Sequence, residues 1–153
     1  MKKLILSILI SLLTVAAAQA QRLVIGERAP EVRVSEWVSG GAAAVAGKPY
    51  LLDFFHSSND QCVANLPKLN DFQRAYSGRL TVVVIARETA DKVTPFVAGK
   101  GYGFHVGLDE GGKTFANYGV RFVPFAVLVD TKGKLVWTGN AATLSDDIIS
   151  KAL

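Results

Sequence analysis

The chain has 153 residues, of which half are hydrophobic and one is a cysteine. This length suggests a single domain with enough apolar residues for a core of ordinary size. Lysine and arginine outnumber aspartate and glutamate by 17 to 13 but never form a run, which gives little support to nucleic-acid binding. The single cysteine excludes an internal disulfide.

The first twenty residues have the three parts of a secretory signal peptide. Lys2 and Lys3 are followed by an apolar run over residues 4–15 and by small residues that end at Ala20. The apolar run is short for a membrane span, which needs about 20 residues, although an uncleaved anchor is the alternative. We therefore expect cleavage near Ala20, a domain over residues 21–153, no stable membrane span after cleavage, and a location in the periplasm or otherwise outside the cytoplasm.

Two strands are predicted at the start of the domain. Val32, Val34 and Trp37 alternate with polar residues, as in an edge strand. Residues 50–55 are apolar except for Asp53, which is typical of a strand buried on both faces. Burial would raise the pKa of the Asp53 carboxyl.

A helix is predicted directly after the second strand, with the cysteine in its first turn. Residues 57–60 are turn and helix-start residues. Cys62 follows at the amino end of the helix, where backbone dipoles can lower the pKa of a thiol. Apolar residues then recur at helical spacing, namely Leu66, Leu69, Phe72 and Tyr76.

The rest of the chain continues the alternation of strands and helices. Such an order predicts an α/β or mixed sheet with helices packed on it. In the last predicted helix, Leu144, Ile148, Ile149 and Leu153 share one side. Strands are predicted over residues 80–86, 104–108, 125–129 and 134–138, and helices over residues 89–100, 111–118 and 143–153.

The stretch from the second strand into the helix resembles the active-site corner of thioredoxin-like proteins, especially the periplasmic TlpA-like and redoxin thiol-disulfide oxidoreductases. In that family a buried strand leads to Trp-Cys-x-x-Cys and a helix with a proline five residues after the second cysteine. Cys62 and Pro67 match the second cysteine and the proline, whereas Ser58 and Asn59 stand in place of the tryptophan and the first cysteine. Asp53 matches a buried acid that serves proton transfer in the family.

A second landmark of the family is a cis proline that begins the strand facing the cysteine pair. Val123 and Pro124 stand at that place, so the resemblance implies that Pro124 is cis. Together the landmarks imply a thioredoxin fold, a central mixed sheet flanked by helices, with an N-terminal strand extension. Backbone around Val123 and Pro124, flanked by Phe55, Phe122 and Phe125, could pair with an extended peptide.

The asparagine makes the expected active site degenerate. A dithiol cycle needs one thiolate to attack and a second thiol to resolve the mixed disulfide, and Asn59 cannot attack. Asparagine is, however, a favoured helix N-cap. Cys62 is then buried and inert, reactive as a lone thiol, or paired with another molecule, and Asp53 either transfers protons to it or has a structural role.

Two functions therefore remain open. One is a thiol-disulfide oxidoreductase of the cell envelope that uses a single thiol on protein or small-thiol substrates. The other is a redox-inactive thioredoxin-like binding module. A peroxiredoxin-like peroxidase is less favoured, because Asn59 replaces the Thr or Ser three residues before the peroxidatic cysteine. His56 and Cys62 are too few ligands for zinc, and we expect no metal or cofactor.

The tripartite amino-terminal segment gives the first testable prediction. We expect the protein recovered from the cell envelope to begin at Gln21, because the small residues at positions 18–20 form a cleavage site. Intact-mass spectrometry of the envelope fraction measures this directly. Protein that keeps Met1 and stays in the cytoplasm would contradict it.

Overall fold

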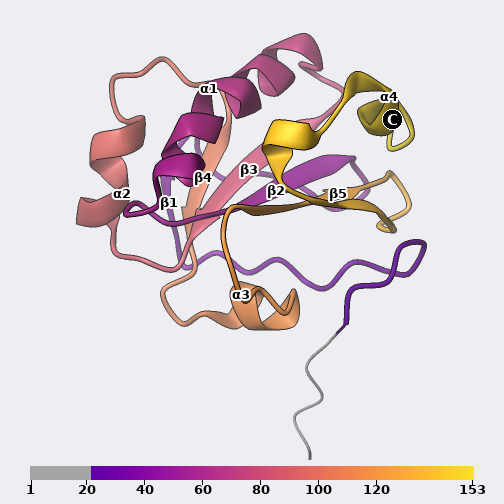
Figure 1. Ribbon diagram of the computed structural model, residues 1–153, viewed down its shortest axis with the longest axis horizontal. Helices are drawn as coiled ribbons and strands as arrows, with labels where there is room; N and C mark the ends of the chain where they lie inside the picture. Colours follow the sequence, from indigo (N-terminus) through magenta and orange to yellow (C-terminus); the bar gives the residue numbers. More distant parts are fainter. Residues whose placement is uncertain (1–21) are drawn as a thin grey trace, which may run out of the picture.

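The computed structural model describes residues 22–153, so the predicted signal peptide over residues 1–20 lies outside the described residues. The described chain forms one six-stranded sheet with helices packed on it (Figure 1). The strands, in chain order, are β1 (Glu36–Ser39), β2 (Tyr50–Phe55), β3 (Thr81–Ala86), β4 (His105–Leu108), β5 (Phe125–Val129) and β6 (Leu135–Gly139). The helices are α1 (Asp60–Ala75), α2 (Ala90–Val97), α3 (Lys113–Asn117), the 3-10 turn η1 (Ala141–Thr143) and α4 (Asp146–Ser150).

The sheet is mixed and has the order β1-β4-β3-β2-β5-β6. Strand β2 is central: it pairs in parallel with β3 and antiparallel with β5. All six of its residues are buried, as expected for an apolar run covered on both faces. This architecture is the mixed sheet with flanking helices that the thioredoxin resemblance implies.

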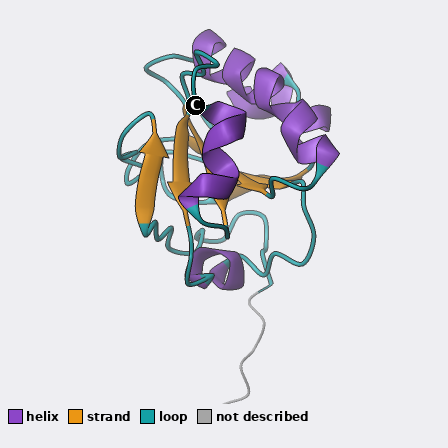
Figure 2. Cartoon of the chain, turned by 90° about the vertical axis from the view of Figure 1, so that its left-hand side faces the viewer, coloured by secondary structure: helices purple, strands orange, loops and turns teal. Residues whose placement is uncertain are grey.

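The helices divide between the two faces of the sheet. One core cluster joins alternate residues of β2 to α1, α2 and α4, and the other joins the remaining β2 residues to α3 and to the segment before β1. In Figures 1 and 2, α3 accordingly lies apart from the other helices. Residue parity along β2 therefore decides which layer each side chain enters.

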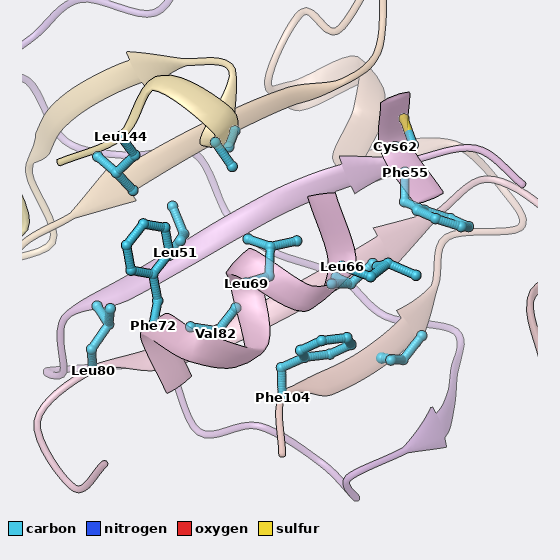
Figure 3. Packing of buried hydrophobic residues seen from close by; sticks show 14 of the residues in the cluster. Leu51, Phe55, Cys62, Leu66, Leu69, Phe72, Leu80, Val82, Phe104 and Leu144 are labelled. Carbon is cyan, nitrogen blue, oxygen red and sulfur yellow. The ribbon is translucent and has the colours of Figure 1, made fainter. Parts of the chain in front are cut away.

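Helix α1 packs along the sheet through its apolar stripe. Leu66, Leu69 and Phe72 are buried, and Figure 3 shows them over Leu51 and Val82 of the neighbouring strands. Each such side chain contributes roughly 1.5–3 kcal/mol when fully buried. This packing fixes the first turn of α1 against the end of β2.

The predicted strand around Val32 and Val34 is wrong for these two residues. The strand β1 begins only at Glu36 and pairs antiparallel with β4. The reason lies in α3: the hydroxyl of Thr114 accepts from the backbone N–H of Arg33 at 2.7 Å and donates to its carbonyl at 2.7 Å. The backbone of this segment is therefore satisfied by a side chain, and the valines pack on the second core cluster.

The long closing helix predicted over residues 143–153 is also wrong. Leu144 has an extended backbone between η1 and α4, and α4 begins only after Ser145. The Ser-Asp-Asp sequence at 145–147 is a helix-start signal, so the chain restarts there instead of continuing a helix. Leu144 and Ile149 are buried, but Leu153 is 41% exposed and is no part of the core.

The other predicted elements match within a few residues at their ends, and the strands over residues 50–55 and 125–129 match fully. Within residues 22–153, none of the helices has the length and apolar character that crossing a bilayer requires.

Candidate active site

The candidate site is the corner where β2 turns into α1. Residues 56–59 make this turn, and the backbone N–H of Asn59 donates to the carbonyl of His56 at 3.1 Å. Cys62 and Phe55 lie next to one another at the carboxyl end of β2 (Figure 3). The corner therefore has the strand, tight turn and helix order expected from the sequence.

Asn59 joins the corner to a distant part of the chain. Its side-chain Oδ1 accepts from the backbone N–H of Cys62 at 3.0 Å, which caps α1. Its Nδ2 donates to the carbonyl of Val123 at 3.3 Å. The peptide bond between Val123 and Pro124 is cis. Both ends of the Asn59 amide are thus occupied in holding the helix start beside the loop before β5.

Cys62 is fully buried, with 0% of its surface exposed. Burial raises the pKa of its thiol to about 11, the charges of Asp53 and Glu88 act in the same direction, and a backbone hydrogen bond at His56 opposes them. The helix position was expected to lower this pKa, but desolvation outweighs the dipole. At pH 7 only about one thiol in 10⁴ is then ionised, so the nucleophilic form is scarce.

Asp53 lies on the same face of β2 as Leu51 and Phe55, the face covered by α1. It is fully buried, and burial raises the pKa of its carboxyl well above the ordinary value. Neither carboxyl oxygen has a hydrogen-bond partner within the described part of the chain. A buried polar group without a partner costs roughly 1–3 kcal/mol. Burial thus disfavours the charged form of Asp53 in the core layer that also holds Cys62.

Two of the aromatic residues expected to flank a bound peptide differ in their exposure. Phe122 is 70% exposed, and its ring meets that of Phe125 edge-on at 6.0 Å. Phe55 is only 1% exposed and packs against Phe96 with ring centroids 6.3 Å apart. Phe55 thus lies on the helix-covered face of β2, and its expected place beside a peptide at Val123 stays a prediction.

A polar cluster around the turn was missed at the sequence level. The carboxylate of Glu88 accepts from the backbone N–H of Ser57 at 2.9 Å and from its hydroxyl at 2.5 Å. His56 lies with Nε2 3.6 Å from Glu88 and with Nδ1 2.8 Å from the Ser58 hydroxyl. The signal was present: Glu88 follows a strand parallel to β2, and parallel strands bring their carboxyl ends to one edge.

No group of three or more histidine, cysteine, aspartate or glutamate side chains that could hold a metal ion occurs among residues 22–153.

Comparisons with known proteins give a family match and similar curated proteins. The AhpC/TSA family matches residues 25–138. The thiol-disulfide oxidoreductase ResA of Bacillus thuringiensis (strain Al Hakam) is 30% identical over 124 residues, which cover 78% of this chain and 71% of that protein. ResA of Bacillus anthracis gives the same values.

Two solved structures are also similar to this chain. A secreted Mycobacterium tuberculosis disulfide oxidoreductase homologous to Escherichia coli DsbE is 28% identical, with a TM-score of 0.58 over 71% of this chain and 81% of that one. The thioredoxin domain of a Bacteroides vulgatus thiol-disulfide oxidoreductase is 20% identical, with a TM-score of 0.68 over 85% and 95%. At that identity the second likeness concerns the fold alone.

The buried acid gives a prediction for stability. Because folding raises the pKa of Asp53, its carboxyl destabilises the folded state least below about pH 4, and this destabilisation grows as the pH rises toward the raised value. Asp53→Asn should therefore melt higher than the wild type at pH 8, by about 3–5 °C or more. The difference should shrink toward pH 3.5.

Thermal unfolding followed by circular dichroism between pH 3.5 and 8 measures this difference. Asp71→Asn, on the exposed side of α1, is the matched control and should follow the wild type. A gain that does not change with pH, or a wild type that melts higher than Asp53→Asn at pH 8, would contradict the assignment.

Proposed function

Because this chain belongs to the AhpC/TSA family, we propose that it is an exported thioredoxin-like protein of the thiol-disulfide oxidoreductase type that performs at most a single-thiol reaction. The observation that carries this proposal is the pairing of Asn59 with Cys62. The position of an attacking cysteine is taken by a capping amide, and the one remaining thiol is fully buried.

The asparagine prevents a dithiol cycle. Such a cycle needs a nucleophilic thiolate and a second thiol that resolves the mixed disulfide. Asn59 supplies neither, and its amide is engaged with Cys62 and Val123. Any mixed disulfide at Cys62 would need an external thiol for its release.

The protonation of Cys62 weakens single-thiol chemistry as well. The thiolate is the attacking species both in disulfide exchange and in the reduction of peroxide. A pKa of about 11 leaves little thiolate at neutral pH. The peroxidase alternative is thus disfavoured by the same burial that slows disulfide exchange.

A second candidate function is a redox-inactive binding module, and the exposure of Phe122 favours it. An aromatic side chain that is 70% exposed beside the Val123 backbone offers an anchor for an extended peptide. The carbonyl of Val123 already accepts from Asn59, so a peptide would use its second lone pair. If the protein is such a module, Phe122→Ala abolishes peptide binding and Cys62→Ser leaves it intact.

Export is part of the proposal. It is supported by the basic, apolar and small-residue segments at positions 1–20, and one structural relative is described as secreted. Substrates or partners would then be proteins or small thiols of the cell envelope.

Reduction of insulin disulfides tests the proposed chemistry. With dithiothreitol as reductant, the wild-type protein should stay near the uncatalysed rate. Asn59→Cys should form an internal disulfide with Cys62 on mild oxidation and raise the rate at least about tenfold, because a thiol at a helix start favours the thiolate. Loss of the cap should cost about 1 kcal/mol, which a folded domain tolerates.

Asp60→Cys is the matched control, since it adds a thiol in the same turn at the wrong spacing. Mass spectrometry of the oxidised proteins reports the disulfide. Fast turnover by the wild type that is lost in Cys62→Ser would contradict the proposal. Two free thiols in folded, oxidised Asn59→Cys would show that the corner lacks thioredoxin-like geometry.

A further inference from the structure

In the polar cluster of His56, Ser58 and Glu88 at the turn between β2 and α1, the donors and acceptors of the hydrogen bonds can be assigned. The backbone N–H of Ser58 donates to Nδ1 of His56 at 3.2 Å. Because a backbone N–H can only donate, Nδ1 carries the lone pair and the neutral ring carries its proton on Nε2. The Ser58 hydroxyl, 2.8 Å from the same Nδ1, therefore donates to it. That distance is within the range of about 2.6–3.2 Å for a nucleophile and its base.

The other side of the imidazole faces a fixed carboxylate. Nε2 of His56 lies 3.6 Å from Oε1 of Glu88. The Glu88 side chain is only 8% exposed and is held by the backbone N–H and hydroxyl of Ser57. A carboxylate at this distance makes no hydrogen bond to the ring, but its charge stabilises the imidazolium that forms when the ring accepts a proton.

This cluster differs from the Cys62 thiol in its exposure to solvent. Ser58 is exposed and the His56 side chain is 47% exposed, whereas Cys62 is fully buried. The 16-residue helix α1 begins two residues after Ser58. The N–H of Cys62 in its first turn is taken by the Asn59 cap, but the helix dipole at this end favours a developing negative charge.

We infer that Ser58, His56 and Glu88 form an acyl-transfer site for small carboxylic esters, with Ser58 as nucleophile, His56 as general base and Glu88 as the positioning residue. The Ser58 oxygen bonds to the ester carbonyl carbon, and its proton passes to Nδ1 of His56. The carbon–oxygen bond to the alcohol breaks, and the alcohol leaves with that proton. Water then releases the carboxylic acid from Ser58 by the same steps.

This activity is separate from the proposed thiol chemistry, since none of its atoms belongs to Cys62 or Asn59. The two can therefore fail independently. It also accounts for the exposed cluster that the thioredoxin resemblance leaves without a role.

Hydrolysis of p-nitrophenyl acetate by the purified protein tests the inference. The wild type should exceed the same concentration of free imidazole, and Ser58→Ala should lower the rate at least about tenfold, because a positioned base contributes about 10²–10⁴-fold. A fluorophosphonate probe should add one adduct that peptide mapping places on Ser58. Ser77→Ala, an exposed serine in the turn after α1, should leave the rate and the adduct unchanged.

The partner residues give a second readout. His56→Gln should be as slow as Ser58→Ala, and the double variant no slower, because the two act as a unit. Glu88→Gln keeps an oxygen for Ser57 but removes the charge that faces the imidazolium, so kcat for p-nitrophenyl acetate should fall while KM and the melting temperature change little. Circular dichroism verifies that each variant is folded. A folded Ser58→Ala with the wild-type rate, or an adduct on Cys62 or a lysine, would overturn the inference.

Discussion

Two hydrogen bonds of the Asn59 amide fix the local geometry of the candidate site. One caps the first turn of α1, and the other ties that turn to the carbonyl of Val123. Residues 59 and 123 are far apart in the sequence, so this single side chain holds together the β2–α1 corner and the loop before β5. The amide accepts and donates at once, whereas a cysteine would make both bonds only weakly. The amide therefore holds this position through hydrogen bonds and is itself no nucleophile.

Burial determines which protonation states of Cys62 and Asp53 are favoured. Cys62 and Asp53 share one layer between β2 and α1, and desolvation raises the pKa of both groups. The helix dipole is worth about 0.3–1 kcal/mol at ordinary sites, which is less than the cost of placing a charge in this layer. The neutral thiol and the neutral acid are thus the forms that fit the core, and the accessible reactive groups lie outside it, at Ser58 and His56.

The sequence predicted the features that depend on local pattern. The runs at residues 50–55 and 125–129 became strands with the expected ends because both are apolar and covered on both faces. The cap formed at Asn59 because an asparagine before a helical pattern has one strong local preference. The sequence did not predict which layer the Phe55 side chain enters, because a strand that is buried throughout does not reveal which side chain faces which layer. The contact of His56 with Glu88 depends on the parallel register of β2 and β3, which spacing alone does not give.

The central claim, that burial keeps Cys62 protonated, is tested most directly by the rate at which iodoacetamide alkylates this single thiol as a function of pH. In the folded protein the rate should be slow at pH 7 and should keep rising toward pH 11. In the denatured protein it should level off above about pH 8.5, the value of a free cysteine. A folded protein whose alkylation rate reaches its plateau below pH 8 would contradict the account.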